Sequence, residues 1–293
     1  MGRITDHLRE KGTLVSDGAW GTFIHEKGLR SDEAPESWNL TRPDDIYEVA
    51  LSYVQAGADL ILTNSFGGSP FKLAPYGLAE KTYAINKAAA EISRRAAGED
   101  VLVLGSVGPT GKMLMMGEVT EEELMAGFVE QVRGLVDGGV DAILIETMSD
   151  MDEARVAIMA ARSVTDIEVM CTFTFTLTPA NEYRTMMGTS PAEAVEMLVR
   201  EGADVVGANC GNGAAGMVEI VRQIRLVDNE IPVLVHANAG MPVLKDGVSV
   251  FPESPGQMSK QIGDLILAGA NIVGGCCGTT PEHISRIVQV VRG

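Results

Sequence analysis

The stretch AGADLILTNSFG, residues 56–67, combines three signals that together indicate one kind of fold. A glycine closes a helix-like segment, an apolar run follows it, and the run ends in small and polar residues. The glycine suits the left-handed residue just past a helix end. An apolar run that ends in polar residues is typical of a buried parallel strand whose carboxyl end meets a pocket.

This pattern recurs along the chain. Three more copies read GGVDAILIETMSD (138–150), EGADVVGANCGNG (201–213) and AGANIVGGCCGTT (268–280). Four further runs also start apolar and end in small or polar residues, but no such glycine motif precedes them. They are LVSDGAWGT (14–22), VLVLGSVGPTG (101–111), VMCTFTF (169–175) and PVLVHANAGMP (232–242). Helical patterns lie between them at 44–57, 79–97, 121–138, 151–164, 190–201, 215–228 and 256–269, with a last one from 281. Eight strands alternating with eight helices predict an α/β fold, a single (β/α)₈ TIM barrel over residues 1–293, ahead of a doubly wound sheet.

Composition narrows the classes of partner. The chain has 33 glycines and 5% aromatic residues, which suits close packing of helices on strands. Its 23 basic and 40 acidic residues give a net charge of −17, which would repel nucleic acid and anionic lipid. No apolar run approaches the ~20 residues that span a bilayer, and the polar start MGRITDHLREKG lacks the apolar core of a signal peptide. We therefore expect a soluble, cytoplasmic protein with neither a nucleic acid nor a membrane as partner; its oligomeric state stays open.

In such barrels the active site lies at the carboxyl ends of the strands. The sequence places polar or sulfur-bearing residues at seven of these ends, where the fold would make them converge. They are Asp17, Thr63, Asn64, Ser106, Glu146, Asn209, Cys210, Asn238, Cys276 and Cys277.

Three of the four cysteines belong to this set. Thiolates from Cys210, Cys276 and Cys277 would suit Zn²⁺, provided that the backbone bends between the adjacent pair, as its glycine neighbours allow. Three ligands leave one position open, and a thiolate-rich zinc suits the activation of a substrate thiol for alkyl transfer. A strained vicinal disulfide or three inert core cysteines are the alternatives. We expect Cys171, which begins the fifth strand, to be a core residue.

Five motifs are similar to those of a known family. GGCCGTTPEHI (274–284), GANCGNG (207–213), SDGAWGT (16–22), ILTNSFGG (61–68) and IETMSD (145–150) resemble the homocysteine S-methyltransferase family, with a likeness from Leu14 to Arg292. PESWNLTRPDDI (35–46), TNSFGG (63–68) and HANAGMP (236–242) look most like the homocysteine-binding module of cobalamin-dependent methionine synthase.

The resemblance implies an enzyme in which zinc on the three cysteines binds homocysteine as a thiolate that is methylated to methionine. It also implies that Asp17 and Glu146 hold the substrate's amino group. The backbone N–H groups of Gly18 and Ala19 would hold its carboxylate. Asn238 would stand near the metal, as a fourth ligand when no thiol is bound. Thr63 and Ser106 are further candidates for substrate contacts, and His236 is expected to be a hydrogen-bonded buried histidine.

The methyl donor is open to two interpretations. Since 293 residues leave no room for donor-binding domains, we expect it to arrive on a methyl-corrinoid protein acting in trans. A small molecule such as S-methylmethionine or betaine is the alternative, but a cationic donor favours an aromatic cage. Aromatic residues near the predicted mouth are few: Trp20, Phe66, Phe71 and Tyr183. The methionine-bearing loops 110–120 and 176–190 would serve as a lid or a docking surface.

Two other classes of function compete with this one. An aldolase-like barrel enzyme would carry a Schiff-base lysine at a strand end, and none of the eight strand candidates contains a lysine. A non-catalytic zinc- and thiol-binding partner of a corrinoid protein would share the same residues, so only an assay separates it from the enzyme.

Overall fold

The computed structural model describes residues 2–245 and 248–293; residues 1, 246 and 247 of the predicted domain 1–293 lie outside the described residues. Eight parallel strands form one ring in the order β1-β12-β9-β8-β5-β4-β3-β2, and a bridge from Ser16 to Leu60 joins its two ends. The strands are β1 (Leu14–Val15), β2 (Leu60–Leu62), β3 (Leu102–Val107), β4 (Ala142–Met148), β5 (Glu168–Phe173), β8 (Val205–Gly213), β9 (Val233–Asn238) and β12 (Ile272–Gly275). The predicted TIM barrel is confirmed.

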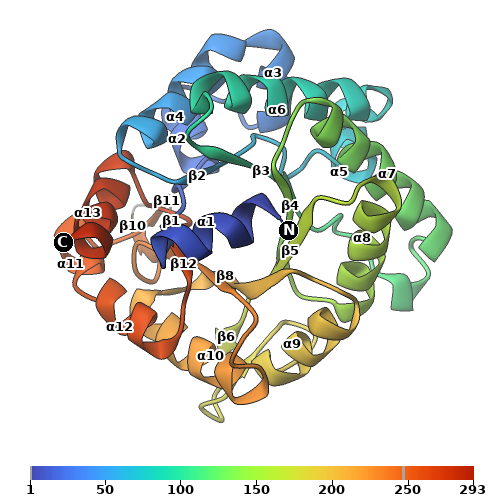
Figure 1. The fold of residues 1–293 in the computed structure, drawn as a ribbon. Coiled ribbons are helices and arrows are strands. Elements are labelled where there is room, and N and C mark those ends of the chain that lie inside the picture. The colour runs from blue at the N-terminus through green and yellow to red at the C-terminus, as the bar shows by residue number, and fades with distance from the viewer. Residues whose placement is uncertain (1, 246–247) are drawn as a thin grey trace.

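Helices surround the ring (Figure 1). They are α4 (Pro43–Gln55), α6 (Thr82–Ala97), α7 (Glu121–Asp137), α8 (Met151–Val164), α9 (Pro191–Arg200), α10 (Ala214–Val227), α11 (Pro255–Ser259), α12 (Ile262–Ala268) and α13 (Pro281–Arg292). The single helix predicted over 256–269 is wrong, because α11 and α12 are separate. Helix α11 packs mainly on α13 and α12 mainly on α10, so the chain changes direction between them.

Most of the shorter elements had no clear signal in the sequence, although the helical pattern predicted at 79–97 begins with one of them, a 3₁₀ turn. They are the helices α1 (Arg3–Lys11), α2 (Gly21–Glu26), α3 (Trp38–Thr41) and α5 (Pro70–Leu73), the single 3₁₀ turns η1 (Pro35–Ser37), η2 (Ala74–Tyr76), η3 (Ala79–Lys81) and η4 (Leu114–Met116), and two hairpins, β6 (Thr176–Leu177) with β7 (Tyr183–Arg184) and β10 (Val243–Lys245) with β11 (Val248–Val250). Helix α1 lies across the centre of the ring (Figure 1). It buries only Ile4, and the backbone N–H groups of Ile4 and Thr5 donate to Glu168 in β5. Leu8, one turn after Ile4, packs against the same apolar cluster, so the helix has a narrow apolar face, although no helix was predicted here.

The interior of the barrel changes character along the strands. Towards the amino ends of the strands it is apolar, built from residues such as Leu104, Leu144, Met170 and Leu234. Alternate residues of a strand point to the same face, so the next inward positions towards the carboxyl ends lie two residues further on. These positions are polar and buried: Ser106, Glu146, Thr172, Asn209 and His236. The strands that fill the core therefore also form the floor of the site.

The repeated AGAD-type motif has a structural role at the opposite end of the barrel. Its last residue precedes every second strand and accepts a hydrogen bond from the backbone N–H of a valine in the strand before it. It also accepts one from an arginine in a surrounding helix. The four sets are Asp59 with Val15 and Arg292, Asp141 with Val103 and Arg94, Asp204 with Val169 and Arg162, and Asn271 with Val233 and Arg225. The repeat thus fastens helices to strands in a fourfold pattern.

This role predicts a stability defect. Arg225 also donates to the backbone carbonyls of Gly269, Asp228 and Ile231, so Arg225→Ala should lower the free energy of unfolding by about 2–4 kcal/mol. Arg222 on the same helix makes only an exposed ion pair, so Arg222→Ala should change it by less than about 0.5 kcal/mol. Urea unfolding measures both; equal effects would refute the assignment.

Among the described residues, no helix is both long enough and apolar enough to cross a membrane.

Candidate metal centre

Three cysteines meet at the carboxyl end of the barrel. Cys210 lies in β8, and Cys276 and Cys277 directly follow the end of β12. Their Sγ atoms all lie within 4.8 Å of one another, and those of Cys210 and Cys277 are 4.0 Å apart. Two sulfurs on one tetrahedral zinc, each ~2.3 Å from it, are separated by roughly 3.8 Å. The cluster therefore fits a single zinc ion, and within the described chain it is the one such grouping of His, Cys, Asp or Glu side chains.

Two backbone bends aim these sulfurs. Cys210 itself has a φ of 58°, in the left-handed region that a side chain rarely adopts, and the β8–β9 register shifts between Asn209 and Gly213. On the other side the left-handed residue is Gly278, with a φ of 79°, where an added Cβ would lie 2.2 Å from Phe251. The predicted bend is therefore present, but it follows the cysteine pair and has a second counterpart at Cys210.

The thiols perturb one another's acidity. Hydrogen bonds from Cys276 and then Cys277 lower the pKa of the Cys210 thiol to about 3. The hydrogen bond with Cys210, together with burial and the negative charge of Cys210, raises the pKa of Cys277 to about 11 and that of Cys276 well above its usual value. Three thiolates so close together repel, and a bound cation would remove that penalty. The donor set thus suits a thiophilic cation.

Two buried polar atoms near the sulfurs have no hydrogen-bond partner among the described residues: Nε2 of His236 and Oδ1 of Asn238. The expectation of a hydrogen-bonded His236 is therefore wrong, because this ring also lines the cavity beside the cysteines. Burial lowers its pKa to about 4, so the ring is neutral near pH 7. The Asn238 side chain helps to lower the pKa of the Cys210 thiol, which puts it beside the cluster. Its role as a fourth ligand stays a prediction.

A cavity of about 290 Å³ opens onto the three cysteines. Most of the predicted site residues line it: Gly18, Ala19, Thr63, Asn64, Ser106, Glu146, Cys210, Cys276 and Cys277. Asp17 and Asn238 are buried beside it and are not among its lining residues. The cavity also has lining residues that were not predicted as part of the site, above all Glu36 and Thr147. The sequence prediction selected the first polar residues after each apolar run. Glu36 lies outside these runs and Thr147 comes after Glu146, so neither was selected.

Two buried carboxyl groups lie at this end of the barrel. Burial raises the pKa of Glu146 to about 7, although its Oε1 accepts a hydrogen bond from the Ser106 hydroxyl. Burial raises the pKa of Asp17 to about 7 as well. Asp17 Oδ2 accepts from the backbone N–H of Leu62 at 2.7 Å and from Trp20 Nε1 at 2.7 Å. Glu146 therefore faces the cavity, and Asp17 holds the cavity-lining Trp20 in place.

The two predicted backbone donors differ in availability. Ala19 N–H already donates to Thr279 Oγ1 at 3.0 Å. Gly18 N–H has no acceptor among the described residues. The predicted contact Thr63 is likewise engaged: its hydroxyl pairs with Ser65 and accepts from the backbone N–H of Ser106. Of these groups, Gly18 N–H is the donor left for a ligand.

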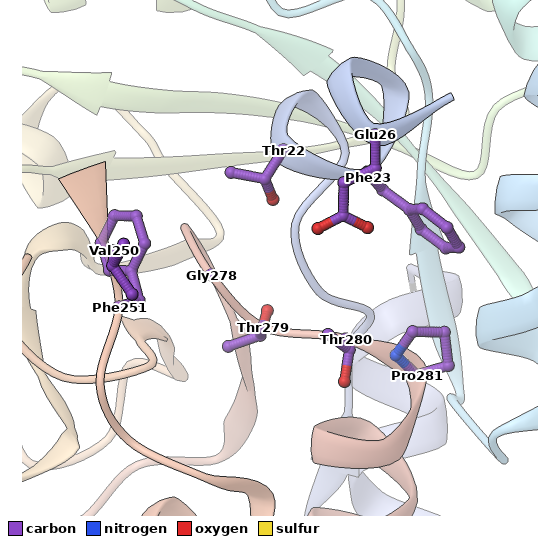
Figure 2. Close-up of a pocket in the computed structure, with 9 residues that line it drawn as sticks. All are labelled: Thr22, Phe23, Glu26, Val250, Phe251, Gly278, Thr279, Thr280 and Pro281. Carbon is purple, nitrogen blue, oxygen red and sulfur yellow. The ribbon is translucent and has the colours of Figure 1, made fainter. Parts of the chain in front are cut away.

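A second cavity of about 390 Å³ is lined by the segment that follows the cysteine pair, residues 278–281. Figure 2 shows Thr22 and Glu26 of α2 facing Thr279 and Thr280 across it. No cysteine and none of the predicted site residues lines this cavity. The residues with metal-binding and acid–base chemistry therefore belong to the smaller cavity.

Comparison with known proteins agrees with this geometry. The family model described as homocysteine S-methyltransferase matches residues 14–291. The methionine synthases of Mycobacterium leprae and Mycobacterium tuberculosis are each 32% identical over 292 residues, a match that covers 95% of this chain and 24% of theirs. The chain thus spans about a quarter of the length of these relatives.

A solved structure has the same fold. The metallated form of the homocysteine methyltransferase MmuM from Escherichia coli superposes with a TM-score of 0.81, at 24% identity and over 99% of both chains. The match of the family model over nearly the whole chain and the identity to the two synthases lead to one conclusion. The chain belongs to the homocysteine S-methyltransferase family, a family of methyltransferases.

Proposed function

We propose that residues 1–293 form a homocysteine-binding zinc barrel that methylates homocysteine to methionine. One observation carries the proposal: three sulfurs within reach of a single ion open onto a cavity that also contains a buried carboxyl group, Glu146. An amino thiol offers a sulfur for the first and an ammonium for the second. Zinc bound by Cys210, Cys276 and Cys277 would supply a site that holds a thiol as a nucleophilic thiolate near neutral pH.

The residues of the chain have separate tasks in this proposal. Glu146, ionised, accepts hydrogen bonds from the substrate ammonium, while Ser106 fixes its orientation. Gly18 N–H is available to the substrate carboxylate. Trp20 and Phe66 line the cavity and limit the access of water. In the transfer itself, the sulfur–carbon bond forms as the bond between methyl and donor breaks, and that electron pair leaves with the donor.

For the donor, we favour a methyl-corrinoid protein. Identity to methionine synthases supports it. So do the exposed side chains of the loops after β3 and β5, the loops predicted as a lid or docking surface. Met115 is 75% exposed, Met116 68% and Met186 77%. Flexible, polarisable methionines suit an adaptable contact with a partner.

A cationic small molecule is the second candidate donor, and a different observation favours it. Trp20 and Phe66 line the cavity together with Glu36, which is only 6% exposed and accepts a hydrogen bond from Gly67 N–H. Two aromatic rings and a buried carboxyl group resemble the surroundings that sulfonium or quaternary ammonium groups favour.

Binding and turnover test the proposal. We expect one zinc per chain, and homocysteine binding to the zinc-loaded protein should release about one proton at neutral pH. Methyl transfer to homocysteine would then be compared for methylcobalamin, methyltetrahydrofolate, betaine and S-methylmethionine. A zinc-loaded protein that ignores homocysteine in calorimetry contradicts the proposal; one that binds it and turns over with none of the donors fits a non-catalytic partner of a corrinoid protein.

A variant at Glu36 separates the two donors. If the donor is cationic, Glu36→Gln should raise its KM by about 10-fold or more, because a buried charge–charge contact is lost. With methylcobalamin as donor the same variant should change the rate less than about 3-fold. Asp32→Asn in the same segment is the control, since Asp32 is exposed and pairs with Arg30 outside the cavity.

A further inference from the structure

Asn209 uses its whole side chain to join three strands at the floor of the cavity. Its Oδ1 accepts from the backbone N–H of Thr147 at 2.8 Å and from the Thr172 hydroxyl at 2.8 Å. Its Nδ2 donates to the Thr147 hydroxyl at 2.7 Å and to Oε2 of Glu146 at 3.3 Å. An amide offers two acceptor sites and two donor hydrogens, so every one is occupied. The residue is fully buried, and rotating the amide by 180° would set its NH₂ against the Thr147 N–H.

One residue that Asn209 hydrogen-bonds and the residue that follows it in the chain are conformationally strained. Thr147 has a φ of 62°, which is unusual for a β-branched side chain, and the β4–β5 register shifts between Ile145 and Met148 at this point. Cys210, the next residue after Asn209, has a φ of 58°. A left-handed residue of this kind is strained and persists only where its surroundings hold it. Asn209 holds Thr147 through two hydrogen bonds and Cys210 through the chain itself.

These contacts tie the two ends of the proposed substrate site together. The backbone of Asn209 continues into the metal-binding Cys210, while its amide ends on the carboxyl group of Glu146. The substrate's sulfur would bind at the metal held by Cys210, and its ammonium group would bind at Glu146. The separation between the two groups must match the number of methylene groups in the amino thiol.

We propose that Asn209 is a positioning residue that sets the spacing between the metal centre and Glu146, and thereby the length of amino thiol that the site accepts. This inference rests on the proposed function. Asn209 touches neither metal nor substrate. It acts by holding Thr147 in its left-handed conformation and the Glu146 carboxyl group in place.

The test compares homocysteine with cysteine, which is one methylene shorter. Calorimetry on zinc-loaded protein gives the Kd of each, and competition with a chromophoric chelator gives zinc affinity. In Asn209→Ala, zinc affinity should stay within about 10-fold of wild type. Homocysteine affinity should fall by up to about 100-fold, the scale of a ~1 Å misplacement, and the preference for homocysteine over cysteine should fall by about 10-fold or more.

Two further variants keep the test decisive. Thr172→Val removes one hydrogen bond from the same amide but leaves Thr147 and Glu146 bound, so zinc affinity and selectivity should both stay near wild type. Asn209→Asp keeps the two bonds to Oδ1 and sets a carboxylate against Glu146. It should fold even if Asn209→Ala does not, and it should lose homocysteine affinity while retaining zinc.

The outcomes separate cleanly. Unchanged selectivity in the Asn209 variants, or an equal loss in Thr172→Val, overturns the positioning role while leaving the proposed function intact. A zinc-loaded wild-type protein that binds neither amino thiol overturns the proposed function, and this inference with it.

Discussion

Cys276→Ser should leave the protein with little or no zinc. The structure puts its sulfur within 4.8 Å of those of Cys210 and Cys277, and a serine hydroxyl is a far weaker ligand than a thiolate. Zinc binding to small four-ligand sites is worth about 10–16 kcal/mol, so losing one ligand should weaken it by on the order of 100- to 1,000-fold. Metal analysis after dialysis against a weak chelator, together with chelator competition, measures the loss. Homocysteine binding should disappear in parallel.

Cys171→Ala is the matched control. Cys171 is fully buried in β5, within the core between the strands and the surrounding helices, and it stands outside the sulfur cluster. Its buried position confirms the sequence prediction that it is a core residue. The variant should keep one zinc per chain, although it will be somewhat less stable. Full zinc retention in Cys276→Ser would show that the cluster is not the metal site.

Glu146→Gln should weaken homocysteine binding without removing the metal. The carboxyl group lines the same cavity as the cysteines, and hydrogen bonds to a charged partner contribute about 1.5–3 kcal/mol. The Kd for homocysteine should therefore rise by about 10- to 100-fold, with the zinc content unchanged. Glu153→Gln is the control, since Glu153 is a buried carboxyl group that binds Thr110 and lies outside the cavity. A comparable loss in Glu153→Gln would point to a general effect on folding.

The same substitution should stabilise the metal-free fold at higher pH. Burial raises the pKa of Glu146 from 4.5 to about 7, so the folded state holds this proton more tightly than the unfolded chain does. Its contribution is most favourable below about pH 4.5 and is lost as the pH rises to about 7, with a slope of up to about 1.4 kcal/mol per pH unit. Glu146→Gln removes that slope and should gain about 1–3 kcal/mol over wild type at pH 8, relative to the difference at pH 4.5.

Urea unfolding in chelator and reductant at the two pH values checks this prediction. Asp17 has a similarly raised pKa and is buried in both proteins, while the effect of its charge on Glu146 is part of the shift that the comparison measures. A difference between the two proteins that does not vary with pH would mean that Glu146 titrates normally in the fold. Weaker homocysteine binding and a more stable metal-free fold at pH 8 in Glu146→Gln would together show that the carboxyl group used for binding lowers the stability of the protein.

The barrel was predictable because its signals are local. Each of the eight strands is a short apolar run that ends in polar residues, and seven of the eight outer helical segments follow the predicted pattern. The exception is the single helix predicted over 256–269. Its two halves pack on different helices, α11 on α13 and α12 on α10, and this depends on contacts distant in sequence. Helix α1 and the hairpins β6–β7 and β10–β11 were not predicted. Helix α1 is short, mostly polar and held by Glu168 of β5, and each hairpin pairs only two or three residues of each strand.

For the candidate site, the sequence by itself determined which side chains lie at the carboxyl ends of the strands, because alternation along a strand and the parallel order of the barrel bring those ends together. It thereby placed Cys210, Cys276 and Cys277 near one another. Only the tertiary structure decided where each of them points. The left-handed bend at Thr147 is held by a hydrogen bond from its backbone N–H to Asn209 in another strand, and the bend at Cys210 directly follows Asn209; no local propensity predicts either bend. Tertiary structure also decided that Glu146 opens to the cavity while Asp17 is covered by Trp20, since each strand end turns only as its neighbours in space allow.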